Sequence, residues 1–494
     1  MDAFVASCGL RVEDDVSKRR RAVARRAFRR GSVVISIPPL FGFPERPGED
    51  SSTEAKAETR AVEPASRCAH CFGPLPPRRP RCSQCHQVLY CSTECLGRHW
   101  ALRHHFECRY TTSTADRAAE KVKPQFRPYL RMAVGVAAAL DNVRKGDPSW
   151  MHVQRAAWSE LLSHQEQYPP HVLRQYAEIA TAIGSADPGG TVTLLCRAGC
   201  NNFAAYESGA PRMCGYLCSP LVSLLLNHSC LPNATFVYED GRQVVRALED
   251  IPEGQEITLA YSDALRPRAD RRTQLESVYF FDCKCAKCSD ASVRGRIDLL
   301  VDREVDSALV PRFLPTDYAR LPEVVPWALY VVGLLLSRVQ GSVALDAFES
   351  GLLGAIDGSE PQDVSFAAYR HWLECQDECL ERIATGQTEL YPWGYVSSLC
   401  VLAFYTLAYP PFYSLVGFQC LEVAKLAWNT LASADQAAGL AVLDVGHIRG
   451  LVQAALSILE VSADPGRARP TENAASAREQ AALLLDQLDQ LDQR

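Results

Sequence analysis

The spacing of hydrophobic positions divides this chain into short strand-like stretches, mostly before residue 290, and longer stretches with helical periodicity. Residues 32–41 form a β-branched run that prolines close, which predicts a strand. Residues 221–261 alternate short apolar segments with turns. A buried strand is expected to run through Leu224–Leu226 into Asn227. The other strands expected here are 234–238, 243–247 and 256–261.

Helical periodicity occupies two other parts of the chain. Within residues 115–184 one helical face carries Tyr129, Leu130, Met132, Ala133, Val136 and Leu140. From about residue 295 the helical pattern continues to the end, where an amphipathic helix is expected around Leu483, Leu484, Leu488 and Leu491. These C-terminal helices could form a degenerate array of helical pairs. Residues 44–66 are rich in Pro, Glu, Ser, Thr and Ala, and predict a mobile loop.

The stretch from Leu390 to Leu421 has no charged residue and is long enough to cross a bilayer. Pro410 and Pro411 interrupt it, and several Ser, Thr and Tyr side chains dilute its hydrophobicity. Two buried helices that meet at the proline pair are therefore the preferred interpretation. A membrane span is the alternative, and no membrane partner is expected.

Composition excludes few classes of protein. The chain has 494 residues, 47% hydrophobic and 22% charged, which is typical of a globular protein with two to four domains. Its net charge of −6 gives no reason to expect tight overall attraction to nucleic acid. The start of the chain lacks the pattern of a secretory signal. Basic residues gather at Lys18–Arg21, Arg25, Arg26, Arg29 and Arg30. A solvated face is the preferred interpretation of that run, and a nuclear-localisation signal is the alternative.

The 20 cysteines give the strongest chemical signal, since most of them stand in closely spaced pairs. Such bunching is typical of metal ligation in a reducing compartment rather than of a disulfide framework. Eight potential ligands lie close together: Cys68, Cys71, Cys82, Cys85, Cys91, Cys95, His104 and Cys108. Zinc prefers four tetrahedral sulfur or nitrogen donors, so these eight predict two closed zinc sites. So small a segment cannot bury a core, and metal binding on the order of 10 kcal/mol per ion has to stabilise it.

A second group of cysteines follows the predicted strands. Cys283, Cys285 and Cys288 leave a zinc ion one ligand short, and Cys230 is the natural fourth ligand. Cys230 ends the sequence Asn227-His228-Ser229-Cys230, whose polar side chains need partners if they are buried. The cysteines outside the two groups are interpreted as buried free thiols.

The first cysteine group resembles the MYND zinc finger. In that family the ligand pairs interleave, which implies one zinc ion held by Cys68, Cys71, Cys91 and Cys95. The other zinc ion would be held by Cys82, Cys85, His104 and Cys108. The resemblance implies partners that are proline-containing peptides or, as the weaker expectation, DNA. The basic residues Arg78, Arg79, Arg81, Arg98 and Arg103 are compatible with either partner.

The later motifs resemble the SET domain. They are Arg30–Val34, Asn227–Cys230, Glu256–Tyr261 and the post-SET group Cys283–Cys288. The segment Cys200-Asn201-Asn202-Phe203 is similar to one typical of proteins that combine SET and MYND domains. The resemblance covers roughly residues 12–290 by specific motifs. A SET domain that is split by a MYND finger and followed by helices is the order found in SET-and-MYND protein-lysine methyltransferases.

The resemblance implies transfer of a methyl group from S-adenosylmethionine to an uncharged lysine amine of a histone or another protein. Tyr261 would be the catalytic residue, because in-line transfer depends on how the amine is oriented. The cofactor-binding residues would be Asn201, Asn227, His228, Tyr261 and Phe281. The lysine channel would be lined by Phe203 and Tyr279. Simple core packing is the competing explanation for each of these aromatic residues.

One motif of the SET domain is replaced in this chain. The family usually carries G-x-G near its N-terminus, where the glycines let the backbone approach the cofactor and take positive φ. Counting back from Gly31, that motif falls on Arg19-Arg20-Arg21. An arginine side chain there could close the pocket, or the loop could shift and bind differently.

The expected fold is α+β, with a β-rich SET core split by a MYND zinc finger, a post-SET zinc cluster and a helical, TPR-like C-terminal domain. The expected segments are 1–66 for the first SET part with its loop, 67–109 for the finger, 110–199 for a helical insert, 200–264 for the second SET part, 265–292 for the post-SET cluster and 293–494 for the helical domain.

Three functional hypotheses remain at this point. The leading one is a protein-lysine N-methyltransferase with three zinc ions, in the nucleus, the cytoplasm or both. The second is a catalytically idle SET fold that recruits partners through its finger, which Arg19 and Arg21 favour. The third is a DNA-binding regulator. Asn227, His228, Tyr261 and the post-SET group favour the enzyme, because an abandoned site has less need of them. The substrate lysine, the number of methyl groups and the oligomeric state are not predicted.

Overall fold

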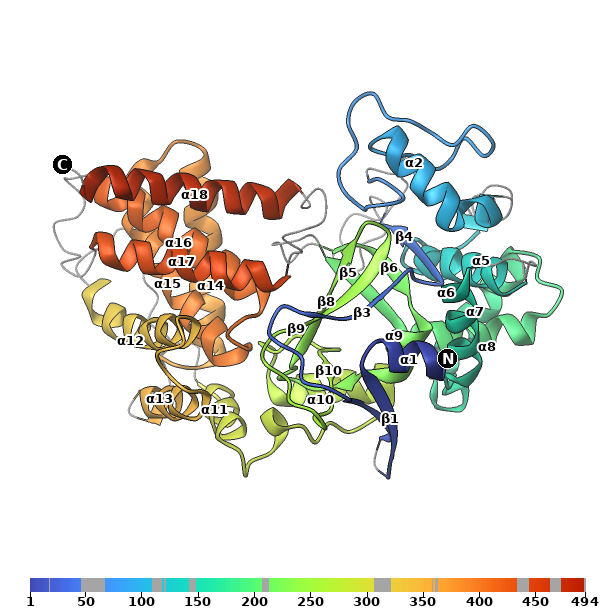
Figure 1. Ribbon diagram of the computed structural model, residues 1–494, viewed down its shortest axis with the longest axis horizontal. Helices are drawn as coiled ribbons and strands as arrows, with labels where there is room; N and C mark the ends of the chain where they lie inside the picture. The colour runs from blue at the N-terminus through green and yellow to red at the C-terminus, as the bar shows by residue number, and fades with distance from the viewer. Residues whose placement is uncertain are drawn as a thin grey trace.

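The structure is a computed structural model, and it describes residues 1–16, 18–45, 67–108, 118–119, 121–141, 148–206, 213–305, 321–357, 359, 363–432, 444–462 and 472–492. The loop expected at 44–66 lies outside these residues from position 46 onward. Small sheets occupy the centre of the molecule, with the helices of residues 321–492 on one side and those of residues 127–199 on the other (Figure 1).

The central strands are short, from two residues in β7 and β10 to six in the longest. They are β1 (Leu10–Asp15), β2 (Arg19–Ala24), β3 (Val33–Ile37), β4 (Phe41–Pro44), β5 (Asn202–Tyr206), β6 (Met213–Cys218), β7 (Asn227–His228), β8 (Ala234–Glu239), β9 (Arg242–Ala247) and β10 (Thr258–Leu259). In the described residues they form the antiparallel pair β1-β2, the antiparallel sheets β3-β9-β8 and β4-β6-β5, and the parallel pair β10-β7.

Segments on both sides of the finger share one hydrophobic core. Leu10, Ile35 and Phe41 from before the finger are buried in the same cluster as Leu226 and Ile257 from after it. Each fully buried side chain of this size contributes about 1.5–3 kcal/mol. The two halves of the expected SET core therefore fold as one unit, and the intervening segments are insertions into it.

The strand predictions are confirmed in part. Strands β8 and β9 cover the strands predicted at 234–238 and 243–247. The strand predicted at 32–41 is present only as β3, Val33–Ile37, and Phe41 already belongs to β4. The strand expected through Leu224–Leu226 is wrong, because Pro220–Leu225 form the helix α9 with the proline in its first turn. A short apolar run has no periodicity that separates a buried strand from a buried helix. The strand expected at 256–261 shrinks to β10, and Glu256 forms only an isolated bridge to Val23.

The predicted helices before residue 200 are present. They are α5 (Arg127–Asp141), α6 (Ser149–Glu160), α7 (Pro170–Ala182) and α8 (Pro188–Gly199). Helix α5 buries the expected face, including Leu130, Met132 and Val136. Two short helices were not predicted: α1 (Asp2–Ser7) and, in the finger, α2 (Thr93–His99), which continues into a π-helical turn at Trp100–His104.

The chain after residue 292 is helical wherever the structure describes it at length. The helices are α11 (Val293–Val301), α12 (Leu321–Val339), α13 (Leu345–Asp357), α14 (Phe366–Ala384), α15 (Tyr391–Ala408), α16 (Ser414–Ala432), α17 (Val445–Ser462) and α18 (Glu472–Asp492). Neighbouring helices from α14 to α18 pack against one another in sequence order. Helix α18 is amphipathic as expected, with Leu484 and Leu488 buried and Leu483 exposed.

The apolar stretch around residue 400 is the core of this helical region. It forms α15 and α16, which are separated at Pro410 and Pro411 as the sequence predicts. Residues Thr388–Ala408 are long and apolar enough to cross a membrane, but 89% of that window is buried inside the protein. This burial favours the interpretation as a core helix.

Buried charges join the helical region to the segment around Cys288. The carboxylate of Asp298 accepts hydrogen bonds from Arg271 at 2.5 and 3.0 Å and from Arg268 at 3.0 Å. Lys287 donates to the carbonyl of Ala408 at 2.9 Å, at the C-terminal end of α15, where a cation is favoured by the helix dipole. Burial lowers the pKa of the Lys287 ammonium to about 8, and the nearby carboxylate of Asp298 opposes that shift.

We expect Asp298→Asn to lower the free energy of unfolding by about 3–5 kcal/mol, because the change leaves buried arginine and lysine charges without their counter-ion. The matched control is Asp290→Asn, which removes the exposed carboxylate that pairs with the same Arg268. That change should cost about 0–1 kcal/mol. Urea unfolding of both variants, followed by tryptophan fluorescence, tests the difference. Equal midpoints for the two variants would contradict the role given to Asp298.

Candidate functional site

Three groups of four metal-ligating side chains converge in the structure. The groups are Cys68, Cys71, Cys91 and Cys95; Cys82, Cys85, His104 and Cys108; and Cys230, Cys283, Cys285 and Cys288. Within each group the ligand atoms all lie within 4.8 Å of one another. These are the same three sets, with the same interleaving, that the sequence and its resemblances predict.

The distances within the groups fit a shared metal ion. Four sulfur atoms that each lie about 2.3 Å from one tetrahedral ion are about 3.8 Å apart. The sulfur atoms of Cys71 and Cys91 are 3.7 Å apart, those of Cys82 and Cys108 are 3.8 Å apart, and those of Cys230 and Cys288 are 3.6 Å apart. None of the cysteines in the described residues is in a disulfide. The donor sets are thus suited to soft metal ions.

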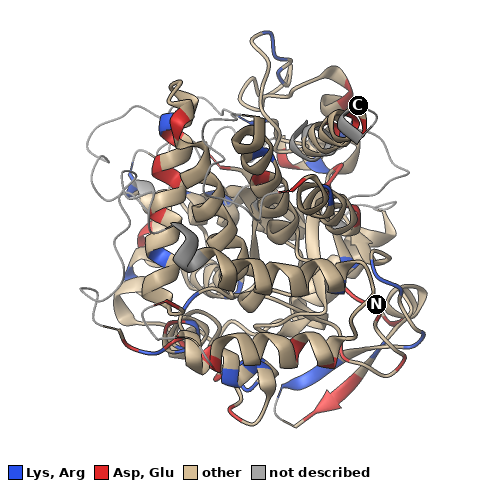
Figure 2. Ribbon diagram, turned by 90° about the vertical axis from the view of Figure 1, so that its left-hand side faces the viewer, with Lys and Arg blue, Asp and Glu red and all other residues tan. Residues whose placement is uncertain are grey.

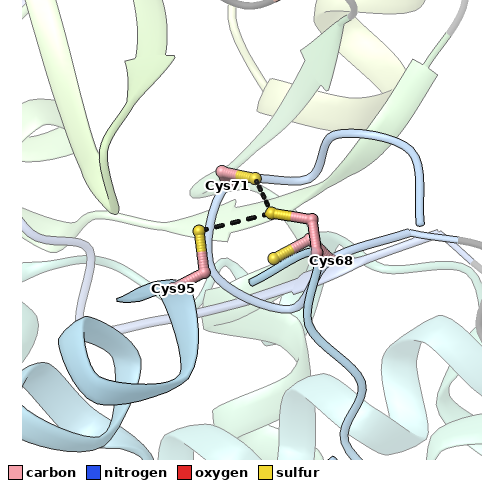
Figure 3. Close-up of side chains that lie close together, drawn as sticks. Cys68, Cys71 and Cys95 are labelled. Atoms are coloured by element: carbon pink, nitrogen blue, oxygen red, sulfur yellow. Dashed lines mark hydrogen bonds between the residues drawn. The ribbon is translucent and has the colours of Figure 1, made fainter. Parts of the chain in front are cut away.

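In the finger, local structure aims the thiols at one point. Figure 3 shows the side chains of Cys68, Cys71 and Cys95 pointing toward one another, the first two from the loop that opens the finger and the third from α2. The hydroxyl of Ser92 caps α2 by accepting a hydrogen bond from the Cys95 amide at 3.1 Å, which fixes where the helix begins. Hydrogen bonds from Cys71 and Cys95 lower the pKa of the Cys68 thiol, which favours the thiolate that binds metal.

The third group joins two segments that are more than fifty residues apart. Cys230 follows β7, and the other three cysteines follow α10 (Arg268–Tyr279). The thiols of this group receive hydrogen bonds from their surroundings. His228 Nε2 lies 3.1 Å from the sulfur of Cys230, and Arg271 Nη2 lies 3.7 Å from that of Cys288. Hydrogen-bond donors around ligating thiolates are typical of metal sites in proteins.

Tyr261 lies beside this third group and is held at both ends. Its phenol donates to the carbonyl oxygen of Leu226 at 2.5 Å, and its backbone amide donates to His228 Nδ1 at 2.9 Å. Burial raises the pKa of the Tyr261 phenol well above its usual range, so the hydroxyl keeps its proton. Burial lowers the pKa of His228 to about 4, so the imidazole is neutral at physiological pH. The two residues thus offer fixed neutral groups rather than charges.

The parallel pairing of β7 with β10 brings these residues together. Asn227 lies opposite Thr258, and His228 lies opposite Leu259. Adjacent to this pair, the Asn227 side-chain amide donates to the carbonyl oxygen of Arg20 at 2.7 Å and to the carboxylate of Glu256 at 2.9 Å. Asn227 is therefore the point where strand β2 and the two motif strands meet.

The arginines that replace the glycine motif stand on β2 opposite an acidic strand. The pairs across this hairpin are Asp15 with Arg19, Asp14 with Arg20 and Glu13 with Arg21. The basic strand and its acidic neighbour lie side by side near the N-terminus in Figure 2. The basic run of the sequence is thus partly neutralised by its own hairpin, which supports its interpretation as a solvated face.

The hairpin keeps the backbone shape that a glycine would have there. Arg19 has φ = 66°, in the left-handed region that glycine adopts most easily. The side chain of Arg20 forms an ion pair of 2.8 Å with Glu160 at the end of α6, and Arg21 forms one of 2.8 Å with Glu13. The carbonyl of Arg20 remains directed at Asn227. The side chains of Arg20 and Arg21 are therefore engaged on acidic partners outside the Asn227–Tyr261 group.

Three consecutive aromatic residues at the end of α10, Tyr279 to Phe281, make different contacts. Phe280 ends the helix with φ = 62° and stacks on His164, with ring centroids 5.0 Å apart. Tyr279 packs on Tyr261 at 4.9 Å, and Phe281 lies 5.9 Å from His228. Both rings are half-buried, so part of their surface stays accessible next to His228 and Tyr261.

Two other predicted site residues, Phe203 and Asn201, make contacts that are explained by packing and helix capping. Phe203 is buried in the central core, where it packs edge-to-face on Phe236 with centroids 5.1 Å apart. Tyr261 packs against the same core cluster. The Asn201 side-chain amide donates to the carbonyl of Arg197 at 2.8 Å and so caps the end of α8. The roles of Phe203 in the lysine channel and of Asn201 in cofactor binding stay predictions.

Two charged residues of this site carry no sequence signal that marks them as members of it. Lys18 and Glu256 form an ion pair of 2.6 Å, and the second oxygen of Glu256 binds Asn227. In the sequence Lys18 belongs to the basic run, and Glu256 is the first residue of the Glu256–Tyr261 motif. The two residues are 238 positions apart, so no local pattern could have paired them.

Comparisons with known proteins agree with this geometry. A model of the SET-domain family matches residues 20–262. The histone-lysine N-methyltransferase ASHR1 of Arabidopsis thaliana is 29% identical over 297 residues, which cover 59% of this chain and 57% of the relative. The N-lysine methyltransferase SMYD2-B of Danio rerio is 27% identical, over 46% of this chain and 52% of the relative. Human SMYD2 is 26% identical, over 46% and 51%.

The chain thus matches little more than half the length of each of these relatives. The matched part contains the strand motifs, the Asn227–Cys230 segment and Tyr261. The family match, the relatives and the three ligand groups agree with one another: residues 20–262 of this chain form a SET domain, and the ligand groups are consistent with the SET-and-MYND type.

Proposed function

We propose that this chain is a protein-lysine N-methyltransferase that uses S-adenosylmethionine. The observation that carries the proposal is the convergence of Asn227, His228 and Tyr261 at the parallel β7-β10 pair, beside partly accessible aromatic rings. A phenol that is held neutral at a fixed position can orient an incoming amine without adding charge of its own. The relatives are named as lysine methyltransferases, which supports the same reaction here.

The residues of the site fit the methyl donor. When bound, S-adenosylmethionine would supply the methyl group on a positively charged sulfur. Asn227 and the carbonyl of Arg20 offer polar groups at one end of the site, and the half-buried ring of Phe281 offers an apolar face at the other. Because the phenol proton of Tyr261 is donated to the carbonyl of Leu226, its oxygen would accept a hydrogen bond from an N–H of the reacting amine. The rings of Tyr279 and Phe281 surround Tyr261. Such apolar surroundings disfavour the ammonium form of a lysine side chain that enters the site.

We propose zinc as the metal in all three ligand groups. Sets of four cysteines, or of three cysteines and one histidine, are the usual composition of closed structural zinc sites. The groups in the finger would stabilise a segment that has few apolar side chains, and the third group would fix Cys230 next to the catalytic residues. All three sites are proposed to be structural, with no open coordination position for a substrate.

The ion pairs of the hairpin favour an enzyme over an idle adaptor. An arginine in place of the usual glycine would argue against activity if its side chain filled the cofactor site. At the two glycine positions, Arg21 instead binds Glu13 and Arg19 is exposed. Between them, Arg20 binds Glu160 with its side chain while its carbonyl stays at Asn227. Recruitment of partners through the finger can coexist with catalysis. The substrate is proposed to be a lysine-containing protein, histone or other, and proline-containing peptides are proposed partners of the finger.

Metal analysis tests the composition of the sites. We expect about three zinc ions per chain after gentle purification. Cys285→Ser should lower the content to about two, because it removes one ligand from the third group alone. Cys375→Ser, which changes a cysteine outside the three groups, should keep three. A content near zero in the unchanged protein would rule out the metal assignment.

Isothermal titration tests cofactor binding without any need for a substrate. We expect S-adenosylmethionine to bind, and at about 100 times its Kd to stabilise the fold by about 2.7 kcal/mol in thermal unfolding. Asn227→Ala should abolish the heat of binding, because it removes the amide at the centre of the site. Arg20→Ala should keep it, because that side chain is engaged on Glu160. No heat and no thermal shift at millimolar cofactor would leave the adaptor as the better hypothesis.

Tyr261→Phe tests the catalytic assignment. The change removes the hydroxyl but keeps the ring, so zinc content and cofactor binding should stay as they are. We expect methyl transfer to a lysine-rich protein mixture to fall about a hundredfold or more, as when a positioned hydrogen-bonding group is lost from other active sites. The matched control is Tyr330→Phe, a change at an exposed tyrosine of α12. Unchanged turnover in the Tyr261 variant would remove this residue from the mechanism.

A further inference from the structure

The imidazole ring of His228 lies between the third ligand group and Tyr261, and it contacts both. Its Nε2 atom is 3.1 Å from the sulfur of Cys230, and its Nδ1 atom is 2.9 Å from the backbone nitrogen of Tyr261. The ring is buried, with 6% of its surface exposed. Both of its hydrogen-bonding positions are therefore used inside the protein.

The partner at Nδ1 decides the tautomer of this ring. A backbone N–H can only donate, so Nδ1 of His228 has to be the unprotonated nitrogen. The proton of the neutral ring is then on Nε2, which points at Cys230. A metal-bound thiolate is a good acceptor for that proton, whereas a protonated thiol is a weak one. Whether Cys230 is a metal-bound thiolate or a thiol thus affects how strongly the ring of His228 is held in one orientation.

We propose that His228 is a positioning residue that links the Cys230 metal site to the backbone of Tyr261. With the thiolate of Cys230 fixed by its metal, Nε2–H has a strong acceptor and the ring keeps one orientation. Nδ1 then stands ready for the amide of Tyr261. Loss of the thiolate weakens the first hydrogen bond and releases the ring from the second. The catalytic part of this inference rests on the proposed function.

Three further contacts make the position of Tyr261 sensitive to this ring. The phenol is bonded to the carbonyl of Leu226, two residues before His228. The amide of Ser229 donates to the carbonyl of Leu259 at 2.9 Å, which closes the β7-β10 pair. The rings of His228 and Tyr261 are in contact, with centroids 5.3 Å apart. Rotation of His228 would therefore remove one end of the support while leaving the phenol end in place.

Two substitutions separate the two halves of this link. In His228→Asn the amide oxygen can occupy the position of Nδ1 and accept from Tyr261, but nothing reaches Cys230. In His228→Gln the amide nitrogen can occupy the position of Nε2 and donate to Cys230, but nothing accepts from Tyr261. A residue that only fills space would respond alike to both changes. If His228 links the two sites, His228→Asn should disturb only the contact with Cys230, and His228→Gln only the contact with Tyr261.

The first measurement is the release of zinc to a coloured chelator from the full-length protein. The phase that belongs to the third group is the one that is missing in Cys285→Ser. We expect His228→Asn to speed that phase about tenfold, because the hydrogen bond to the ligating thiolate is lost. His228→Gln should release zinc at nearly the rate of the unchanged protein.

The second measurement is hydrogen exchange at the amide of Tyr261, resolved by mass spectrometry. Here His228→Gln should exchange about tenfold faster, as expected for the loss of one buried hydrogen bond, and His228→Asn should stay nearly unchanged. If transfer activity is present, kcat should fall further in His228→Gln than in His228→Asn, because only the first loses the contact with Tyr261.

The control pair is His371→Asn and His371→Gln. His371 Nε2 lies 3.6 Å from the sulfur of Cys375 on α14, a histidine–cysteine contact outside the three ligand groups. Neither change should affect zinc release or the exchange of Tyr261. The link is refuted if His228→Gln leaves Tyr261 exchange unaltered, if His228→Asn leaves zinc release unaltered, or if both variants change both quantities equally. Zinc release and exchange do not depend on methyl transfer, so an inactive unchanged protein would count against the proposed function alone.

Discussion

Cys230 has to meet Cys283, Cys285 and Cys288 at a single point, and much of the site follows from that constraint. Four thiols do not gather in a protein interior without a reason, because their thiolates repel one another unless a cation lies between them. When they do gather, the strand that ends at Cys230 and the segment after α10 are tied together. This connection places Tyr279 beside Tyr261 and Phe281 beside His228. It also places the ring of His228 beside the sulfur of Cys230.

The same constraint extends into the helical region. Lys287, between two of these cysteines, reaches the carbonyl at the end of α15, and Arg294 of α11 reaches the preceding carbonyl of Leu407 at 3.2 Å. Both cations bind the end of the helix that carries partial negative charge. The carboxylate of Asp298 balances the positive charges of Arg271 and Lys287, with which it forms ion pairs. The C-terminal helices are thereby oriented by the segment that carries the third ligand group, and not by hydrophobic packing alone.

Sequence reasoning succeeded where the chemistry is local. A C-x2-C pair is one turn of chain, so Cys68 with Cys71 could be predicted as paired ligands from their spacing. The resemblance assigned Asn227–Cys230 and Glu256–Tyr261 to one site, but the parallel pairing of β7 with β10 was not predicted. The ion pair of Glu256 with Lys18 could not be predicted, because a contact across 238 residues leaves no trace in composition or periodicity. The role of Asp14 and Asp15 opposite the arginines was missed for a related reason, since the hairpin register is set by pairing that the sequence does not display.

The error at Leu224–Leu226 has a different cause. Three apolar residues in a row are compatible with a buried strand or a buried helix, and only Pro220 at the first turn of α9 distinguishes them. The replacement of glycines by arginines was interpreted as a threat to the cofactor site because a sequence shows what a side chain is, but not where it points. Glu160 and Glu13, which engage Arg20 and Arg21, come from an insert helix and from the neighbouring strand.

Crystallographic data collected on both sides of the zinc absorption edge would test the central claim most directly. We predict an anomalous peak among Cys230, Cys283, Cys285 and Cys288, with His228 between that peak and the backbone of Tyr261. Electron density with no metal at this position, or with these sulfur atoms paired in disulfides, would contradict it.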